Sequence, residues 1–128
     1  MSRLIAISNR VAAPSSSKTA GGLAVGILAA LRKSGGIWFG WGGKTCHGEP
    51  SEPRLEDHGN ITFATVDIDE ADFDSYYNGF CNGTLWPLLH FMLGILSYDR
   101  AHHEAYQRVN QLFARKLRPL LEPGDHLW

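Results

Sequence analysis

The chain has 128 residues, with 12 Lys and Arg against 13 Asp and Glu and a formal net charge of −1. This length suits one domain with one core, and the charge balance argues against nucleic-acid binding, which needs a basic face. No apolar run approaches the roughly 18 residues that span a bilayer, and the N-terminus has no signal-peptide core. Cys46 and Cys81 form no metal or redox motif. We therefore expect a cytoplasmic protein without a membrane partner.

The first half of the chain alternates between short apolar runs and one helical pattern. Three runs indicate strands: Leu4–Ile7, at the start of the strand-like stretch 4–10, then residues 37–41 and residues 61–68. Apolar residues at helical spacing, closed by two glycines, indicate a helix: Ala24, Ile27, Leu28, Leu31, then Gly35 and Gly36. Polar stretches with prolines and glycines indicate surface loops over residues 11–20 and 42–59.

The second half is mainly helical in pattern. Asp69 and Asp72 resemble a capping pair at a helix start. Aromatic residues then share one face of a short helix, which Asn82-Gly83 should break: Phe73, Tyr76, Tyr77 and Phe80. Residues 86–96 are apolar and predicted helical, with Pro87 near the start. The last helix has an apolar face: Tyr106, Val109, Phe113 and Leu117. A turn over residues 122–125 and a strand beginning at 126–128 follow. Strands alternating with helices predict an α/β fold around a parallel sheet.

Gly21-Gly22 lies between the first strand and the first helix. Unpaired backbone N–H groups and the helix dipole make such a helix start a seat for phosphate, and Arg10, at the end of the strand, adds a cation. The spacing is neither the G-x-G-x-x-G fingerprint nor a P-loop. This pattern is compatible both with a phosphate site and with a plain turn.

Aromatic rings accompany these polar loops. On a strand, Trp38 and Trp41 should point to opposite faces, so that one can face a cleft. With Tyr77 and Trp86, such rings suit a sugar, whose C–H faces stack on them; a purely structural core is the alternative. The histidines have no metal-ligand spacing, and no Ser-His-Asp or Cys-His arrangement can be assembled. We expect no metal and no cofactor.

Six segments together resemble the N-terminal part of the trehalose-6-phosphate synthase family, over essentially the whole chain: residues 4–10 (LIAISNR), 20–26 (AGGLAVG), 35–43 (GGIWFGWGG), 76–82 (YYNGFCN), 85–90 (LWPLLH) and 106–110 (YQRVN). The resemblance implies a retaining glycosyltransferase with two Rossmann-like domains, the GT-B architecture. Residues 1–128 would then be the N-terminal portion of the acceptor-binding domain, a partial Rossmann-like domain.

The resemblance also implies a reaction and a set of contacts. Glucose would pass from UDP-glucose to glucose 6-phosphate by front-face attack, without a metal, and the leaving phosphate would help to take the acceptor proton. Arg10 would contact the phosphate of glucose 6-phosphate, and Trp41, Tyr77 and Trp86 would line the acceptor site. Tyr77 is preferred to Tyr76 because of its spacing from Trp86. Gly21-Gly22 would meet the donor's phosphates through backbone N–H groups.

Other groups that the family uses are not in these residues. The resemblance places the Arg/Lys pair that neutralises the diphosphate, and the acids that hold the donor sugar and ribose, in the C-terminal domain. Because neutralising a leaving diphosphate is a large part of such catalysis, we expect the 128-residue chain alone to be inactive. Two other functions remain open: a non-catalytic module that binds a sugar phosphate or a subunit, and a glycogen-synthase-like nucleotide-binding domain. Because an incomplete sheet exposes apolar surface, we also expect the chain to form a homo-oligomer or to need the missing half.

Overall fold

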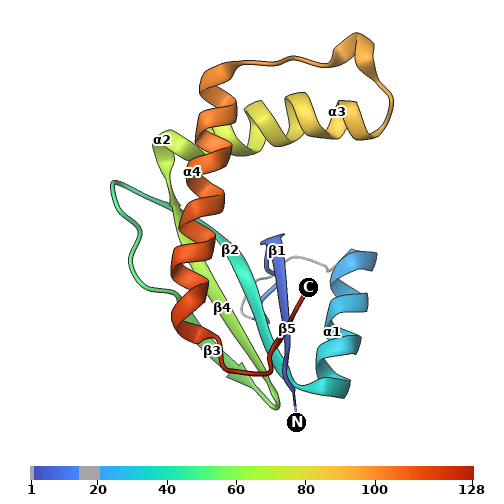
Figure 1. Cartoon of the computed structure of the whole chain (residues 1–128), viewed down its shortest axis with the longest axis vertical. Coiled ribbons are helices and arrows are strands. Elements are labelled where there is room, and N and C mark those ends of the chain that lie inside the picture. Colours follow the sequence, from blue (N-terminus) through green and yellow to red (C-terminus); the bar gives the residue numbers. More distant parts are fainter. Residues whose placement is uncertain (1, 15–20) are drawn as a thin grey trace. The chain divides into compact units, whose positions relative to one another are not determined.

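The computed structural model describes residues 2–14 and 21–128. The chain forms two compact units, and Figure 1 labels their helices and strands. The first unit comprises Met1–Lys44, Ser51–Asp67 and Lys116–Trp128, and the second comprises Thr45–Pro50 and Ile68–Arg115. Of the loop expected over residues 11–20, the part at 11–14 is neither helix nor strand, and the remainder lies outside the described residues.

A five-stranded sheet forms the first unit, in the order β3-β4-β2-β1-β5. Its strands are β1 (Leu4–Arg10), β2 (Gly36–Cys46), β3 (Arg54–His58), β4 (Ile61–Asp69) and β5 (His126–Leu127). β1 pairs in parallel with both β2 and β5, whereas β3 and β4 are antiparallel. The predicted α/β class is confirmed, with β1 parallel to both of its neighbours.

Helix α1 (Gly22–Ser34) connects β1 to β2 and confirms the predicted first helix. It buries Ile27 and Leu31 and ends at Gly35, whose φ is 70°. These side chains join one core cluster with residues from β1, β2 and β4: Ala6, Val11, Ile27, Leu31, Trp38, Ile61 and Phe63. Burying one large aliphatic side chain contributes about 1.5–3 kcal/mol, so this cluster holds the helix against the sheet.

The segment expected to be a loop over residues 42–59 is the clearest wrong prediction. β2 continues through this region to Cys46, and β3 pairs with β4 from Arg54–Thr65 to His58–Ile61. This edge strand lacks the apolar alternation that reveals a half-buried strand in sequence, because neither of its faces is buried. Its side chains are stabilised by cross-strand pairs, including Arg54 with Asp67 at 2.6 Å.

The predicted strand at 126–128 is confirmed as β5, which is attached to β1 by main-chain and side-chain contacts. The main-chain bonds run from Trp128 N to Ile5 O (2.9 Å) and from Ile7 N to Trp128 O (2.8 Å). Just before β5, the Asp125 carboxylate accepts two bonds from the Arg3 guanidinium, at 3.0 and 2.7 Å. The predicted turn at 122–125 is present, since Asp125 N donates to Glu122 O.

Acid should weaken this attachment. The bonds from Arg3, and then the bond from the Glu122 N–H, hold the pKa of Asp125 below its ordinary value. A carboxylate whose pKa is lower in the folded state stabilises the fold above its unfolded pKa, and this stability is lost as the pH falls through the folded pKa. We expect the urea concentration at the midpoint of unfolding to decrease as the pH is lowered below about 4. In the Asp125→Asn variant this decrease should be smaller. An unchanged acid profile in the variant would contradict this.

The second unit is helical, with α2 (Glu70–Phe73), the π-helix η1 (Asp74–Leu85), α3 (Trp86–Leu89), the 3-10 turn η2 (Leu93–Ile95) and α4 (Arg100–Leu117). A further 3-10 turn, η3 (Arg118–Leu120), follows α4. The predicted aromatic face is confirmed for two of its four residues, since Tyr76 and Phe80 pack on Tyr106 of α4, with ring centroids 6.1 and 4.6 Å apart. Phe73 and Tyr77 instead stack on each other. None of the described helices is long and apolar enough to cross a membrane.

Three expectations for this unit need correction. Asn82-Gly83 does not end the helix, because tertiary bonds hold this turn: Gly83 O accepts from Ser97 N at 2.9 Å, and Thr84 Oγ1 donates to Ser97 O. Helix α3 ends at Leu89, so residues 90–96 form only the short turn η2.

The capping pair is the third correction. Asp69 does cap α2, accepting from Ala71 N at 2.9 Å. Asp72 instead binds the Arg108 guanidinium, with Nη2 and Oδ1 2.7 Å apart.

Candidate functional site

The carboxyl ends of β1 and β2 and the first turn of α1 lie at one edge of the first unit. This follows from the topology, because α1 returns the chain between two parallel strands. Figure 1 shows the arrow tip of β1 and the start of α1 at the same end of the sheet. In open α/β sheets, ligands bind outside the carboxyl ends of the strands. Arg10, at the end of β1, and Gly21-Gly22, at the start of α1, belong to this edge.

Arg10 is placed opposite Trp41 by a bulge in β1. Ser8 pairs with Gly40, but the next pair is Arg10 with Trp41, so that β1 advances two residues while β2 advances one. A bulge of this kind redirects a side chain at the end of a strand. The guanidinium carbon Cζ of Arg10 lies 5.2 Å from the centroid of the Trp41 ring, a cation–π contact. The structure therefore brings these two predicted residues together.

Trp41 is more buried than the alternation argument allows. Trp38 is 1% exposed and Trp41 is 5% exposed, so the expectation that one of them opens into a cleft is wrong. Trp38 donates its Nε1–H to Ser8 Oγ (2.8 Å), and Trp41 donates its Nε1–H to Lys44 O (2.7 Å). Both indole N–H groups are thus used inside the protein. The contact that Trp41 offers toward the edge of the sheet is with Arg10, which is exposed.

Gly43 lets Arg10 reach this position, and sequence reasoning missed it. Its φ is 94°, and a Cβ built there would lie 2.9 Å from Nη2 of Arg10. Any larger residue would be strained in the backbone and would also push against the guanidinium. The available clue was the Gly-Gly pair directly after Trp41.

Gly21 and Gly22 begin α1 as the sequence predicts. Gly21 is the N-cap, with φ −70° and ψ 174°, and no side chain of a described residue caps the helix there. A Cβ built on either glycine would meet no described atom within 4 Å. The described part of the chain therefore leaves room beside the first backbone N–H groups of α1, where the helix dipole favours an anion.

Tyr77 and Trp86 belong to the second unit and are described there by themselves. The Tyr77 ring stacks on Phe73 at 5.5 Å, and the Trp86 ring stacks on His90 at 4.1 Å. Trp86 is 47% exposed, and His90 Nδ1 lies 2.7 Å from Trp86 O. His90 is a contact that the sequence analysis missed, although its i+4 spacing from Trp86 on a helix indicates a neighbour.

Tyr76 differs from Tyr77 in its surroundings. Tyr76 is 5% exposed, and burial raises the pKa of its hydroxyl well above the ordinary value. Tyr77 is only half-buried. Of the two adjacent tyrosines, Tyr77 is thus the one whose ring is accessible to a solute.

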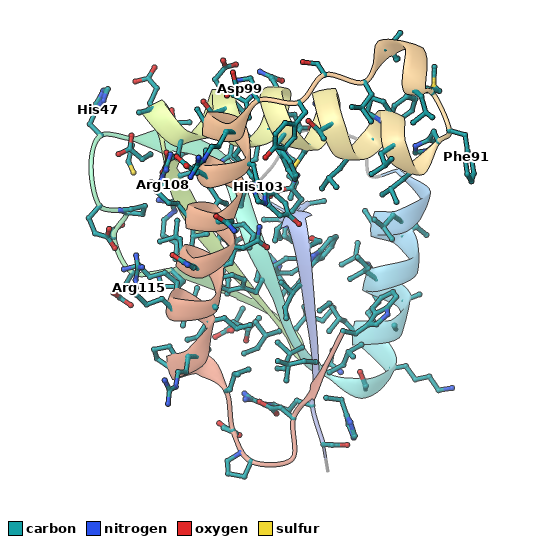
Figure 2. All side chains as sticks on the ribbon, turned by 45° about the horizontal axis from the view of Figure 1, so that its top comes forward. His47, Phe91, Asp99, His103, Arg108 and Arg115 are labelled. Carbon is teal, nitrogen blue, oxygen red and sulfur yellow. The ribbon has the colours of Figure 1, made fainter. Side chains whose placement is uncertain are left out.

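A separate cavity of about 300 Å³ lies in the second unit and is lined by none of the predicted site residues. Its charged walls pair with one another: Arg108 with Asp72 at 2.7 Å, and Arg115 with Glu49 at 2.8 Å. Figure 2 shows both arginines projecting from α4. A third acid of the lining, Asp69, accepts from the backbone N–H groups of Gly48 and Ala71, so the charged groups of the cavity are already engaged with partners inside the protein.

Comparison with known proteins gives a consistent result along the whole chain. Residues 5–128 match the model of glycosyltransferase family 20. The chain is 50% identical to the trehalose-6-phosphate synthase of Cronobacter sakazakii, covering 100% of the chain and 27% of that relative. It thus spans about a quarter of the length of the curated relatives that it matches.

Solved structures agree with this match. The UDP-forming α,α-trehalose-phosphate synthase of Burkholderia xenovorans in complex with glucose 6-phosphate is 47% identical, with a TM-score of 0.87, over 98% of this chain and 27% of that one. A structure from E. coli bound with UDP-2-fluoro glucose is 46% identical, with a TM-score of 0.88, over 99% of this chain and 27% of that one. The likeness covers both described units.

Proposed function

The chain belongs to glycosyltransferase family 20, and from this premise we propose that a protein containing it transfers glucose from UDP-glucose to glucose 6-phosphate, forming trehalose 6-phosphate and UDP. Relatives about half identical to it are trehalose-6-phosphate synthases. Because the chain covers about a quarter of those relatives, we assign residues 1–128 to the N-terminal portion of the acceptor-binding domain. This reaction needs no resident cofactor.

The observation that carries the proposal is the position of Arg10. Its guanidinium is exposed at the carboxyl edge of the sheet, and the Trp41 ring supports it at 5.2 Å. Arg10 forms no ion pair with a carboxylate of the described residues, unlike Arg3, Arg54 and Arg108. A planar guanidinium binds phosphate oxygens through paired N–H bonds. We therefore assign Arg10 to the phosphate of glucose 6-phosphate, with Trp41 positioning it.

The glycines at the start of α1 would meet the other substrate. Among the described residues, no atom occupies the space where a Cβ of Gly21 or Gly22 would lie, and this space, with the positive end of the α1 dipole, suits the diphosphate of UDP-glucose. Backbone N–H groups stabilise negative charge without reorganising when it develops on the leaving group. This role requires close approach to the backbone, which a side chain at either position would obstruct.

Tyr77 and Trp86 would hold the acceptor sugar. Both present an aromatic face that the chain does not fully cover, whereas Tyr76 is buried. Aromatic faces stack on the C–H surface of a sugar, and a tyrosine hydroxyl can bond a sugar hydroxyl. Trp86 is stacked on the His90 ring and is 47% exposed, so part of its surface is available to a sugar.

The test separates binding from turnover. The 128-residue chain is titrated calorimetrically with glucose 6-phosphate and with glucose, and release of UDP is assayed with both substrates. We expect saturable binding of glucose 6-phosphate, much weaker binding of glucose, and no release of UDP from this chain alone. Equal affinity for the two sugars would contradict the phosphate role of Arg10. Release of UDP by the chain alone would contradict its expected inactivity, and binding without turnover in the family-length protein would favour a non-catalytic module.

Two glycine-to-alanine substitutions, at Gly43 and at Gly48, test the role of Gly43. Gly43→Ala places a methyl group 2.9 Å from Nη2 of Arg10, so the guanidinium must shift from its place beside Trp41 or the backbone must adjust. We expect affinity for glucose 6-phosphate to fall about tenfold, equivalent to about 1.4 kcal/mol. Gly48→Ala is the matched control, because its φ of 82° imposes similar backbone strain while its Cβ meets nothing within 4 Å. Equal loss of affinity in both variants would show that strain, rather than Arg10, is responsible.

A further inference from the structure

The hydroxyl of Ser8 connects the core of the first unit to the main chain of Arg10. It accepts a hydrogen bond from the buried Trp38 indole, with Nε1 and Oγ 2.8 Å apart, and donates one to Arg10 O at 2.7 Å. A hydroxyl has one hydrogen to donate. Because the indole N–H can only donate, the Ser8 hydrogen is directed to Arg10. The two bonds therefore run in one direction, from Trp38 through Ser8 to Arg10.

The main chain of Ser8 is fixed by the neighbouring strand β2. Ser8 pairs with Gly40 in the parallel register, and a Cβ built on Gly40 would overlap the main-chain oxygen of Ser8. The two strands thus approach each other more closely here than a side chain on β2 would allow. Trp38, two residues earlier on β2, is part of the core cluster. Ser8 is therefore a fixed point from which its hydroxyl can hold the residues that follow.

The peptide group that joins Arg10 to Val11 is held at both of its polar atoms. The bulge lies between Ser8 and Arg10, and a bulge interrupts the regular ladder of main-chain bonds. The Ser8 hydroxyl spans it by binding Arg10 O, a local side-chain bond to the main chain. On the other side of the same peptide group, Val11 N donates to Trp41 O at 2.9 Å. These two bonds together fix the plane of the peptide that follows Arg10.

We propose that Ser8 is a positioning residue for phosphate binding, and this inference rests on the proposed function of Arg10. The direction in which the Arg10 side chain leaves the strand depends on the peptide plane that Ser8 holds. At its far end, the guanidinium lies 5.2 Å from the centroid of the Trp41 ring and against Gly43. Ser8 thus orders the guanidinium before the ligand arrives, which reduces the conformational entropy lost on binding. Ser8 itself touches no substrate in this role.

Two measurements on the 128-residue chain test this. The first is the NMR chemical shift of the Arg10 side-chain protons in the absence of ligand, which the ring current of Trp41 displaces from the random-coil value. The second is calorimetric titration with glucose 6-phosphate and with glucose. Ser8→Ala should return the Arg10 shifts toward random-coil values. It should also weaken glucose 6-phosphate about three- to tenfold, the net worth of one hydrogen bond, and leave glucose unchanged.

Variants that keep part of the Ser8 side chain extend the test. Ser8→Thr retains the hydroxyl on a side chain that strands favour, so its Arg10 shifts and its affinity for glucose 6-phosphate should stay close to those of the original chain. Ser8→Cys keeps the size of the side chain but donates only weakly. It should give an intermediate loss, and it takes the place of Ser8→Ala if circular dichroism shows that the alanine variant does not fold.

Ser34→Ala is the matched control. The Ser34 hydroxyl also donates to a main-chain oxygen, that of Ala30 at 3.1 Å, but it lies at the opposite end of α1 from Gly21. This variant should change neither measurement. Because Ser8 acts through Arg10, Ser8→Ala should cause no further loss of affinity for glucose 6-phosphate in a chain that already carries Arg10→Ala.

The outcomes separate this proposal from the proposed function. Arg10 shifts that stay unchanged in Ser8→Ala, a Ser8→Thr chain as weak as Ser8→Ala, or a further loss in the double variant overturns the positioning role of Ser8. An original chain that binds glucose 6-phosphate no better than glucose overturns the phosphate role of Arg10 instead. In that case the ligand-free Arg10 shifts still decide whether Ser8 holds Arg10 in place.

Discussion

Replacing Arg10 with alanine should weaken the binding of glucose 6-phosphate by about 10- to 100-fold while changing the affinity for UDP-glucose by less than about twofold. Removing a charge-assisted hydrogen bond costs about 1.5–3 kcal/mol, and each 1.4 kcal/mol is a factor of ten. The loss should fall on one substrate because Arg10 lies beside Trp41, while the donor is assigned to the start of α1. Calorimetric titration of each ligand measures both effects.

Two control variants sharpen this experiment. Arg10→Lys retains the charge but loses the planar pair of N–H donors, so it should recover only part of the lost affinity. Arg32→Ala removes an exposed arginine from the last turn of α1, at the opposite end of that helix from Gly21, and should change neither affinity. Equal weakening of both ligands by Arg10→Ala would show that Arg10 supports the site as a whole instead of binding one phosphate.

Gly36→Ala should be the most destabilising small substitution in the first unit. Gly36 has φ 146°, and a Cβ there would lie 1.8 Å from the carbonyl oxygen of Leu4, its partner in the parallel β1–β2 pairing. The strands must separate to accommodate it, so we expect a loss of more than about 4 kcal/mol in the free energy of unfolding. Urea denaturation followed by circular dichroism measures this loss.

The matched control makes the same chemical change in α1. Gly26 is exposed, and a Cβ there meets no described atom within 4 Å. Because alanine has the higher helix propensity, Gly26→Ala should stabilise the chain by about 0.5–1 kcal/mol. The two substitutions therefore differ in sign as well as in size. Similar losses in both would mean that the contact with Leu4 is not what makes Gly36 necessary.

The parts of the fold that sequence predicts best are those with both a regular apolar pattern and a clear stop. β1, α1 and β4 meet this condition, and their observed bounds lie close to those expected. β3 does not, because it is a polar edge strand. The turn at Asn82-Gly83 shows the opposite error: a strong local breaker is overridden by bonds to Ser97, thirteen or more residues away in sequence.

The residues of the candidate site also differ in whether the sequence alone predicts them. Gly21 and Gly22 are detectable because a strand, a loop and a helix start follow one another within a short stretch of chain. The contact between Arg10 and Trp41 is not detectable from local pattern, because it depends on pairing between two strands and on a bulge in one of them. For the same reason, alternation misjudges Trp41: a face that a simple strand would expose is covered in the folded unit.

The contact between Arg10 and Trp41 also provides an optical probe within the native sequence. Trp38 and Trp41 are buried, whereas Trp86 and Trp128 are 47% and 68% exposed, so short-wavelength indole emission comes mainly from the first pair. Of that pair, Trp41 has a cation over its ring. In the acceptor site that we propose, a phosphate that draws the guanidinium toward itself should change the electric field at this indole. We therefore expect the blue side of the emission spectrum to follow occupancy of that site without any added label.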